Sequence, residues 1–151
     1  MKKTITILSA VILFFTAASF TNKGPENDNE AVNAVFKTNF SGADEVSWKQ
    51  IDNFYCVGFT LNGRVMGAAY DAEGQQLCTS RLITREEVPE KLLKRAEGNY
   101  RNGKSGPYVL ELTYKGETSY YFDIITDRFA IRCMADADGV ITEDERMKLQ
   151  K

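Results

Sequence analysis

The sequence contains no histidine. This absence excludes the Ser-His-Asp and Cys-His systems that activate most hydrolytic nucleophiles, and it removes the commonest protein ligand of zinc. Adjacent carboxylates such as Glu86 and Glu87 diverge on a helix and flank solvated segments, so they do not form an acid/base pair. We therefore expect no enzyme activity, no catalytic residues, no metal site and no cofactor.

The chain is also poor in clustered positive charge. It has 19 basic and 21 acidic residues, and the basic residues are scattered among the acids. A surface that follows a phosphate backbone needs Lys and Arg gathered on one face. Nucleic acid is therefore an unsuitable partner.

Three cysteines would allow one disulfide and leave an odd thiol. The expected strand order separates Cys56 and Cys78 by one intervening strand, about 10 Å, which exceeds the roughly 7 Å Cα limit for a bridge. Cys133 is expected to point into a core. We therefore expect three reduced cysteines that pack as small apolar side chains.

A helix needs about 20 apolar residues to span a bilayer, and the one long apolar run of this chain is shorter than that. Lys2 and Lys3 precede an apolar stretch from Ile5 to Phe15, and small residues follow it. This pattern predicts a cleaved signal peptide over residues 1–19 and a periplasmic or secreted protein with no membrane contact after cleavage. Removing Lys2 and Lys3 leaves 17 basic against 21 acidic residues, a net charge of −4. Residues 20–28 are polar and predict a disordered leader.

Beyond residue 29 the sequence contains the same pattern of a helix followed by strands twice. Two helical patterns with apolar residues at i, i+4 and i+8 each precede a set of short strands joined by similar turns; the helical residues are Val32, Phe36, Phe40 and Leu92, Ala96, Tyr100. We therefore predict an α+β fold, a tandem repeat of a helix plus an antiparallel four-stranded sheet. One domain at 29–151 would hold repeat one at 29–83 and repeat two at 84–142.

Turn residues set the expected register. Asn62-Gly63 pairs Leu61 with Arg64 and places Phe59 opposite Met66. In the second repeat, a three-residue loop around Gly116 would put Tyr108, Leu110 and Leu112 on the same face as Phe122 and Ile124. The strand at Val140 and Ile141 is expected to be short, and the charged tail from 142 to 151 to fray.

The face of each sheet turned away from its helix is the expected binding surface. In the first repeat, a strip of small residues on this face consists of Gly58, Gly67 and Ala69. In the second, Tyr121, Arg132 and Met134 fall together, a combination enriched in interfaces. These six residues are the predicted contacts with another envelope protein, although packing between the repeats would also explain them.

The segment Asp136-Ala137-Asp138-Gly139 resembles part of an EF-hand loop, with Thr142 and Glu145 at later ligand positions. Met134 stands at position 1, where a carboxylate is required, and a strand precedes the segment. The same turn chemistry at Asp71 to Gly74 favours a hairpin turn, and weak calcium binding stays open.

The residues also match a family pattern. Phe40-Ser41-Gly42-Ala43 leads to Val46-Ser47-Trp48, followed by Tyr70-Asp71-Ala72-Glu73-Gly74 and by a segment from Ile83 to Pro89 that opens the second helix. Over about Ala31 to Ile141 the chain resembles the PepSY-like family of small exported bacterial proteins, also described as β-lactamase-inhibitor-like. The resemblance implies two helix-plus-sheet repeats and a binding or inhibitory role without catalytic residues.

Two functions follow as expectations. The first is a non-catalytic exported module that binds an envelope protein, with inhibition of an enzyme such as a β-lactamase or a peptidase as one form of it. The second is a small-ligand or calcium-responsive periplasmic binding protein that uses Asp136 and Asp138.

Overall fold

The computed structural model describes residues 27–150, so the predicted signal peptide at 1–19 and most of the leader at 20–28 lie outside the described residues. The chain divides into two compact units at the bond between Ser80 and Arg81. Within residues 27–150, no helix is long and apolar enough to cross a bilayer.

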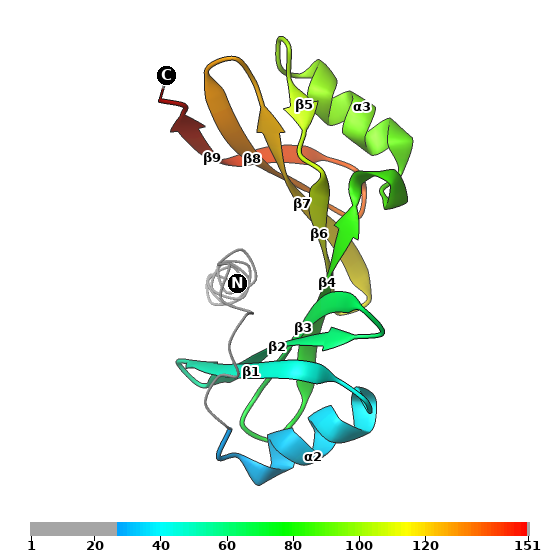
Figure 1. Ribbon diagram of the computed structural model, residues 1–151, viewed down its shortest axis with the longest axis vertical. Coiled ribbons are helices and arrows are strands. Elements are labelled where there is room, and N and C mark those ends of the chain that lie inside the picture. Colours follow the sequence, from blue (N-terminus) through cyan, green and yellow to red (C-terminus); the bar gives the residue numbers. More distant parts are fainter. Residues whose placement is uncertain (1–26, 151) are drawn as a thin grey trace. The chain divides into compact units, whose positions relative to one another are not determined.

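The first unit holds one helix and the first strands (Figure 1). In chain order these are α2 (Glu30–Asn39), β1 (Asp44–Ile51), β2 (Phe54–Leu61), β3 (Arg64–Tyr70) and the first part of β4 (Gln76–Thr84). The second unit begins with the end of β4 and continues with a 3-10 turn, η1 (Arg85–Glu87), α3 (Glu90–Gly98), β5 (Lys104–Ser105), β6 (Tyr108–Tyr114), β7 (Glu117–Ile125), β8 (Phe129–Ala135) and β9 (Ile141–Lys148).

The predicted tandem of a helix plus a four-stranded sheet is wrong. The described residues form one antiparallel nine-stranded sheet with the order β1-β2-β3-β4-β6-β7-β8-β9, in which β5 pairs with β7, together with two short α-helices. The reason lies in β4, because the boundary predicted between the repeats, at residues 83 and 84, falls within this strand. It continues to Thr84 and has β3 and β6 as its neighbours, so the strand order runs through it without a break.

Helix α2 forms where the sequence predicts it. The Asn29 side chain caps its first turn by accepting a hydrogen bond from the Val32 N–H at 3.1 Å. Val32 and Phe36 lie one turn apart, so they share the face that packs on the sheet. Their buried partners are Val57, Phe59, Ala68 and Tyr70.

An aromatic cluster dominates this first core. The Phe36 ring meets Phe59 at 5.1 Å and Trp48 at 5.3 Å between ring centroids, in both cases edge to face. Phe59 lies opposite Met66 in the β2–β3 pair, as predicted. Trp48 lies opposite Val57 in the β1–β2 pair.

The second unit has a core of its own between α3 and the sheet. Val88, Leu93 and Ala96 come from the helical segment, and the sheet contributes Val109, Phe122, Ile124, Ile131, Cys133 and Ala135. Thr84 and Glu87 form a capping box around η1, and Pro89 is the N-cap residue of α3.

The predicted register of the β6–β7 hairpin is wrong by one residue. Lys115 and Gly116 both have positive φ, 51° and 81°, so they form a two-residue turn and pair Tyr114 with Glu117. A slip of one residue moves every side chain to the other face. Leu110 therefore lies opposite Tyr121, and Val109 takes the core place expected for its neighbours.

The charged tail does not fray as predicted but forms β9 against β8. The register pairs Arg132 with Glu145 and Cys133 with Glu143, so Asp144 is an additional residue, a β-bulge. Strand β1 carries a similar irregularity between Asp44 and Ser47. Both end strands of the sheet thus have broken edges, a feature that discourages pairing with other chains.

We expect Phe36→Ala to destabilise the first unit by about 3 to 5 kcal/mol, because it removes the ring on which the aromatic cluster packs. Trp48 is the chain's single tryptophan, so its fluorescence reports this core. Urea unfolding followed by Trp48 emission measures the loss. A change below about 1 kcal/mol would contradict the central position of Phe36.

Candidate functional site

A hollow of about 660 Å³ opens on the second unit beside the end of α3. It is bounded by the loop after α3, the turn between β7 and β8, and strand β9. We call it the arginine hollow; its lining residues are Asn99, Tyr100, Arg101, Asn102, Thr126, Asp127, Arg128, Phe129, Ile131 and Arg146.

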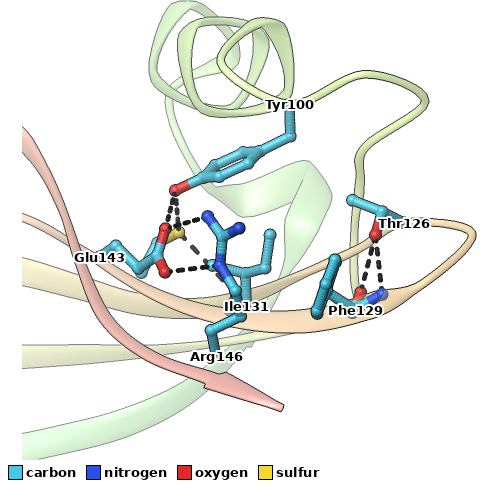
Figure 2. Close-up of polar contacts among 7 residues, drawn as sticks. Tyr100, Thr126, Phe129, Ile131, Glu143 and Arg146 are labelled. Carbon is cyan, nitrogen blue, oxygen red and sulfur yellow. Dashed lines mark hydrogen bonds and ion pairs between the residues drawn. The ribbon is translucent and has the colours of Figure 1, made fainter. Parts of the chain in front are cut away.

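The β7–β8 turn is fixed by the hydroxyl of Thr126. This oxygen accepts a hydrogen bond from the Phe129 N–H at 2.9 Å, and the hydroxyl donates to the Phe129 carbonyl at 3.1 Å (Figure 2). It also accepts one from the Arg128 N–H at 3.3 Å. The Leu149 N–H donates to the Arg128 carbonyl at 2.8 Å. The backbone that carries Arg128 is therefore held on both sides.

The loop after α3 is tied to this turn across the mouth of the hollow. Asn102 has a left-handed φ of 58°, and its side-chain amide donates to the Asp127 carboxylate at 3.0 Å. Gly103 follows and is buried, and its N–H donates to the Tyr100 carbonyl at 3.0 Å. These contacts set the spacing between the loop and the turn.

The bulge at Asp144 builds the wall of the hollow. Residues three apart in a regular strand point to opposite faces. Because Asp144 is inserted, Glu143 and Arg146 instead lie opposite the core residues Cys133 and Ile131, on the face that α3 covers. There the Arg146 guanidinium donates two hydrogen bonds to the Glu143 carboxylate, at 2.7 and 2.8 Å.

Tyr100 joins this pair from the other side, as Figure 2 shows. Its hydroxyl donates to the Glu143 carboxylate at 3.1 Å and lies 3.7 Å from the Cys133 sulfur. Burial and these neighbours raise the pKa of Tyr100, so it stays protonated. The hydrogen bonds of Arg146 lower the pKa of Glu143, so it stays ionised.

The thiols are not nucleophiles at neutral pH. Burial raises the pKa of Cys133, and it raises the pKa of Cys56 to about 11 and of Cys78 to about 12. The thiolate is the reactive form, and it is scarce at such values. All three cysteines are free and buried, and β3 separates the strands of Cys56 and Cys78, as expected.

The hollow is positively charged in an acidic chain. Its lining contains three arginines and one aspartate, whereas the whole chain has a formal charge of −2. Arg146 is neutralised by Glu143 and lies 5.3 Å from the centre of the Phe129 ring. Within residues 27–150, the guanidinium groups of Arg101 and Arg128 have no ion-pair or hydrogen-bond partner. We call these two residues the rim arginines.

A second hollow, of about 490 Å³, lies on the first unit and is lined by Asn27, Asp28, Asn29, Trp48, Lys49, Gln50 and Tyr55. Its lining has one acid and one base. It therefore lacks the charge preference that distinguishes the arginine hollow.

The predicted binding residues lie elsewhere. Gly58 and Gly67 face each other in the β2–β3 pair, and Ala69 lies opposite Cys56; all of them are buried. In the second unit, Tyr121 lies opposite Met134, as predicted, and only 6% of its surface is exposed. Burial raises the pKa of Tyr121 to about 12.

Among the predicted binding residues, Arg132 forms two ion pairs. Its guanidinium lies 3.2 Å from Asp123 and 3.7 Å from Glu145, and 21% of its side chain is exposed. The predicted surface therefore stays a proposal in which Arg132 and Met134 offer more area than Tyr121. Sequence reasoning missed Arg101, Arg128 and Arg146, because they come from three separate segments that only the fold brings together.

Asp136 forms a hairpin turn, the interpretation that the sequence favoured over a calcium loop. Its carboxylate accepts hydrogen bonds from the N–H groups of Asp138 at 3.0 Å and Val140 at 2.8 Å. Asp71 binds the N–H groups of Glu73 and Gln75 in the same way, at 3.1 and 2.8 Å. Among the described residues, no group of three or more acidic or cysteine side chains is placed to hold a metal ion.

This arrangement of sheet and helices defines a fold that solved structures share. The chain is similar to a DUF2874 family protein from Bacteroides ovatus, with a TM-score of 0.65 and 17% identity over 82% of this chain and 89% of that one. It is equally similar to a predicted periplasmic protein from Bacteroides eggerthii, with a TM-score of 0.65 and 14% identity over 84% and 90%.

A BLIP-like protein from Bacteroides fragilis has a TM-score of 0.63 and 17% identity, over 85% of this chain and 91% of that one. The chain therefore has the BLIP-like fold, which confirms that part of the resemblance; the PepSY-like part is not confirmed. No family model and no curated protein sequence matches the chain.

Gly103 and Gly98 offer a matched test of the loop. A Cβ on Gly103 would lie 2.8 Å from Ile124 Cγ2 and 2.9 Å from Tyr100 Cβ, whereas a Cβ on Gly98 would meet nothing within 4 Å. We expect Gly103→Ala to destabilise the protein by about 1 to 3 kcal/mol, and Gly98→Ala to be neutral or stabilising by up to about 1 kcal/mol. Urea unfolding of both variants measures this, and equal effects would contradict the close packing at Gly103.

Glu97 anchors the base of the same loop. Its carboxylate accepts hydrogen bonds from the Ser105 N–H at 2.8 Å, the Ser105 hydroxyl at 3.0 Å and Arg85 at 3.2 Å. The backbone hydrogen bond from Ser105 is the largest cause that lowers the pKa of Glu97, with smaller contributions from the Ser105 hydroxyl, Arg85 and Lys104.

Because the folded pKa of Glu97 lies below its ordinary value of 4.5, its contribution to stability is present above pH 4.5 and is lost as pH falls through the folded pKa. We expect Glu97→Gln to destabilise the protein by about 1 to 3 kcal/mol at pH 7. The variant should then lose less stability than the wild type between pH 5 and pH 3. Urea midpoints across this range measure the effect, and parallel curves would show that Glu97 makes no such contribution.

Proposed function

We propose that this chain is a non-catalytic periplasmic module that binds another protein of the cell envelope. The observation that carries the proposal is the arginine hollow, where arginine, tyrosine and phenylalanine side chains gather around an open depression. Arginine and tyrosine are enriched among the residues that dominate binding energy, and phenylalanine is enriched in protein interfaces. The BLIP-like fold of the neighbours is consistent with such a role.

The location rests on two supports. The first 19 residues have the pattern of a cleaved signal peptide, and one structural neighbour is a predicted periplasmic protein. One form of the proposed function is inhibition of an envelope enzyme such as a β-lactamase or a peptidase, which the family resemblance implies. The outer face around Arg132 and Met134 is a second surface that a partner of this kind could contact.

A small-ligand or calcium-responsive role has weaker support. The hollow is large enough for a small molecule, since such pockets range from about 300 to 1,000 Å³. However, six of its ten lining residues are exposed, whereas a small-molecule site usually buries most of its ligand. The Asp136 carboxylate is already occupied by backbone N–H groups of its own turn.

The test uses the protein recovered from its host. We expect the immobilised protein to retain one envelope protein that then forms a complex of defined stoichiometry with it when both are purified, as measured by light scattering and calorimetry. An exported protein of similar size and charge serves as the control bait. Retention of nothing beyond this control, or a small molecule bound to the native protein by mass spectrometry, would contradict the proposal.

A further inference from the structure

We propose that the arginine hollow binds a polypeptide carboxylate, the C-terminal carboxylate of a partner chain, with the partner's last apolar side chain against Phe129. This inference rests on the proposed function and names the chemistry that the partner presents. It is argued from four properties of the hollow: its free positive charge, its fixed spacing, its apolar base and its openness.

The free charge comes from the rim arginines. Arg146 is compensated by two hydrogen bonds to Glu143. Asp127 keeps its negative charge, because its partner Asn102 is a neutral amide, so the two rim arginines face one carboxylate and the lining retains a net positive charge. Arg101 and Arg128 have no such compensation in the part of the chain that the structure describes. A guanidinium presents parallel N–H groups that match the two oxygens of a carboxylate, so an anion of this shape complements the rim.

The spacing of the rim is set before any ligand arrives. Arg101 lies on the loop after α3, and Arg128 lies on the β7–β8 turn. The hydrogen bond between Asn102 and Asp127 joins these two segments directly beside the arginines, and the Thr126 hydroxyl fixes the turn. The two segments that carry the donors are therefore fixed before binding, which reduces the ordering cost of the backbone.

The base of the hollow is apolar. Ile131 is buried there, and the partly exposed Phe129 ring lies beside it on β8, as Figure 2 shows. The Arg146 guanidinium lies 5.3 Å from the centre of the Phe129 ring. A ligand that combines a carboxylate with an adjacent apolar group therefore matches the hollow better than a small inorganic anion does.

The openness of the hollow favours a polypeptide over a small molecule. Its rim is made of exposed side chains, including Asn99, Asn102 and both rim arginines. A chain terminus needs only its last residue inserted, and the rest of the partner supplies further contact area. C-terminal carboxylate capture is one of the recurring modes of peptide recognition.

The test is a titration of the uniformly 15N-labelled protein with acetyl-Ala-Ala-Phe carrying a free C-terminal carboxylate, followed by amide chemical shifts. We expect shifts confined to residues 99–103, 126–131 and 146. The same peptide with a C-terminal amide should bind about tenfold more weakly or not at all, the effect of losing one charge-assisted hydrogen bond.

Variants assign the effect to the rim. Arg101→Gln and Arg128→Gln should each weaken binding of the free-carboxylate peptide about tenfold. Lys91→Gln removes the same charge from an exposed position of α3 outside the hollow, so it should leave the affinity unchanged. Equal losses of affinity in all three variants would show that the overall charge of the protein causes the effect, and would overturn the proposal.

Two further ligands separate the sources of the anion. If inorganic phosphate or 3-phenylpropionate binds as tightly as the peptide, the hollow is a small-anion site and the proposal is overturned. Equal affinity of the amidated peptide, or no shifts at all, overturns it too.

A double Arg101→Gln, Arg128→Gln variant that still forms the wild-type complex with its envelope partner would end this inference and leave the proposed function standing. A wild type that captures no partner would end the function instead.

Discussion

The register of the antiparallel pairs is the constraint on which the rest of this structure depends. It is imposed at two-residue turns, Asn62-Gly63 and Lys115-Gly116, where both residues have positive φ. Such a turn matches the twist of the strands that it joins and leaves no freedom in the pairing. Once Leu61 faces Arg64 and Tyr114 faces Glu117, each side chain is assigned to one face of the sheet.

Both cores follow from that assignment. In the first unit, Phe59 and Val57 arrive on the face that Phe36 of α2 can cover, and the aromatic rings interlock edge to face. In the second unit, Val109, Phe122 and Ile131 arrive under α3. Each helix is about ten residues long, too short to be stable alone, so its stability comes from the apolar face on which it packs.

Local signals in the sequence predicted local structure well. The turn at Asp136 formed as a hairpin turn, and the Asn62-Gly63 register was correct, because each depends on residues within a few positions of one another. The errors came where the local signal is weaker or the partner is distant. Lys115-Gly116 lacks the Asn-Gly pair that marks a two-residue turn most strongly. The course of β4 to Thr84 depends on its neighbour β6, further along the chain.

The candidate site was out of reach for the same reason. Arg101, Arg128 and Arg146 stand in a loop, a turn and a strand, and each alone has the pattern of an ordinary solvated charge. The arrangement depends on a single inserted residue, Asp144, which changes the parity of β9 and brings Glu143 and Arg146 onto one face. The charged sequence of the tail predicts fraying, because nothing in it indicates the position of a β-bulge.

The bulge connects two properties that would otherwise be independent. A strand at the end of a sheet is a hazard, because its unpaired backbone can recruit another chain, and an irregularity at that edge reduces the hazard. In β9 the same irregularity directs Arg146 over Phe129 and ties it to Glu143, which withdraws one arginine from the hollow and leaves its charge to the two at the rim. Protection of the edge and the charge pattern of the hollow therefore have a common structural origin in Asp144.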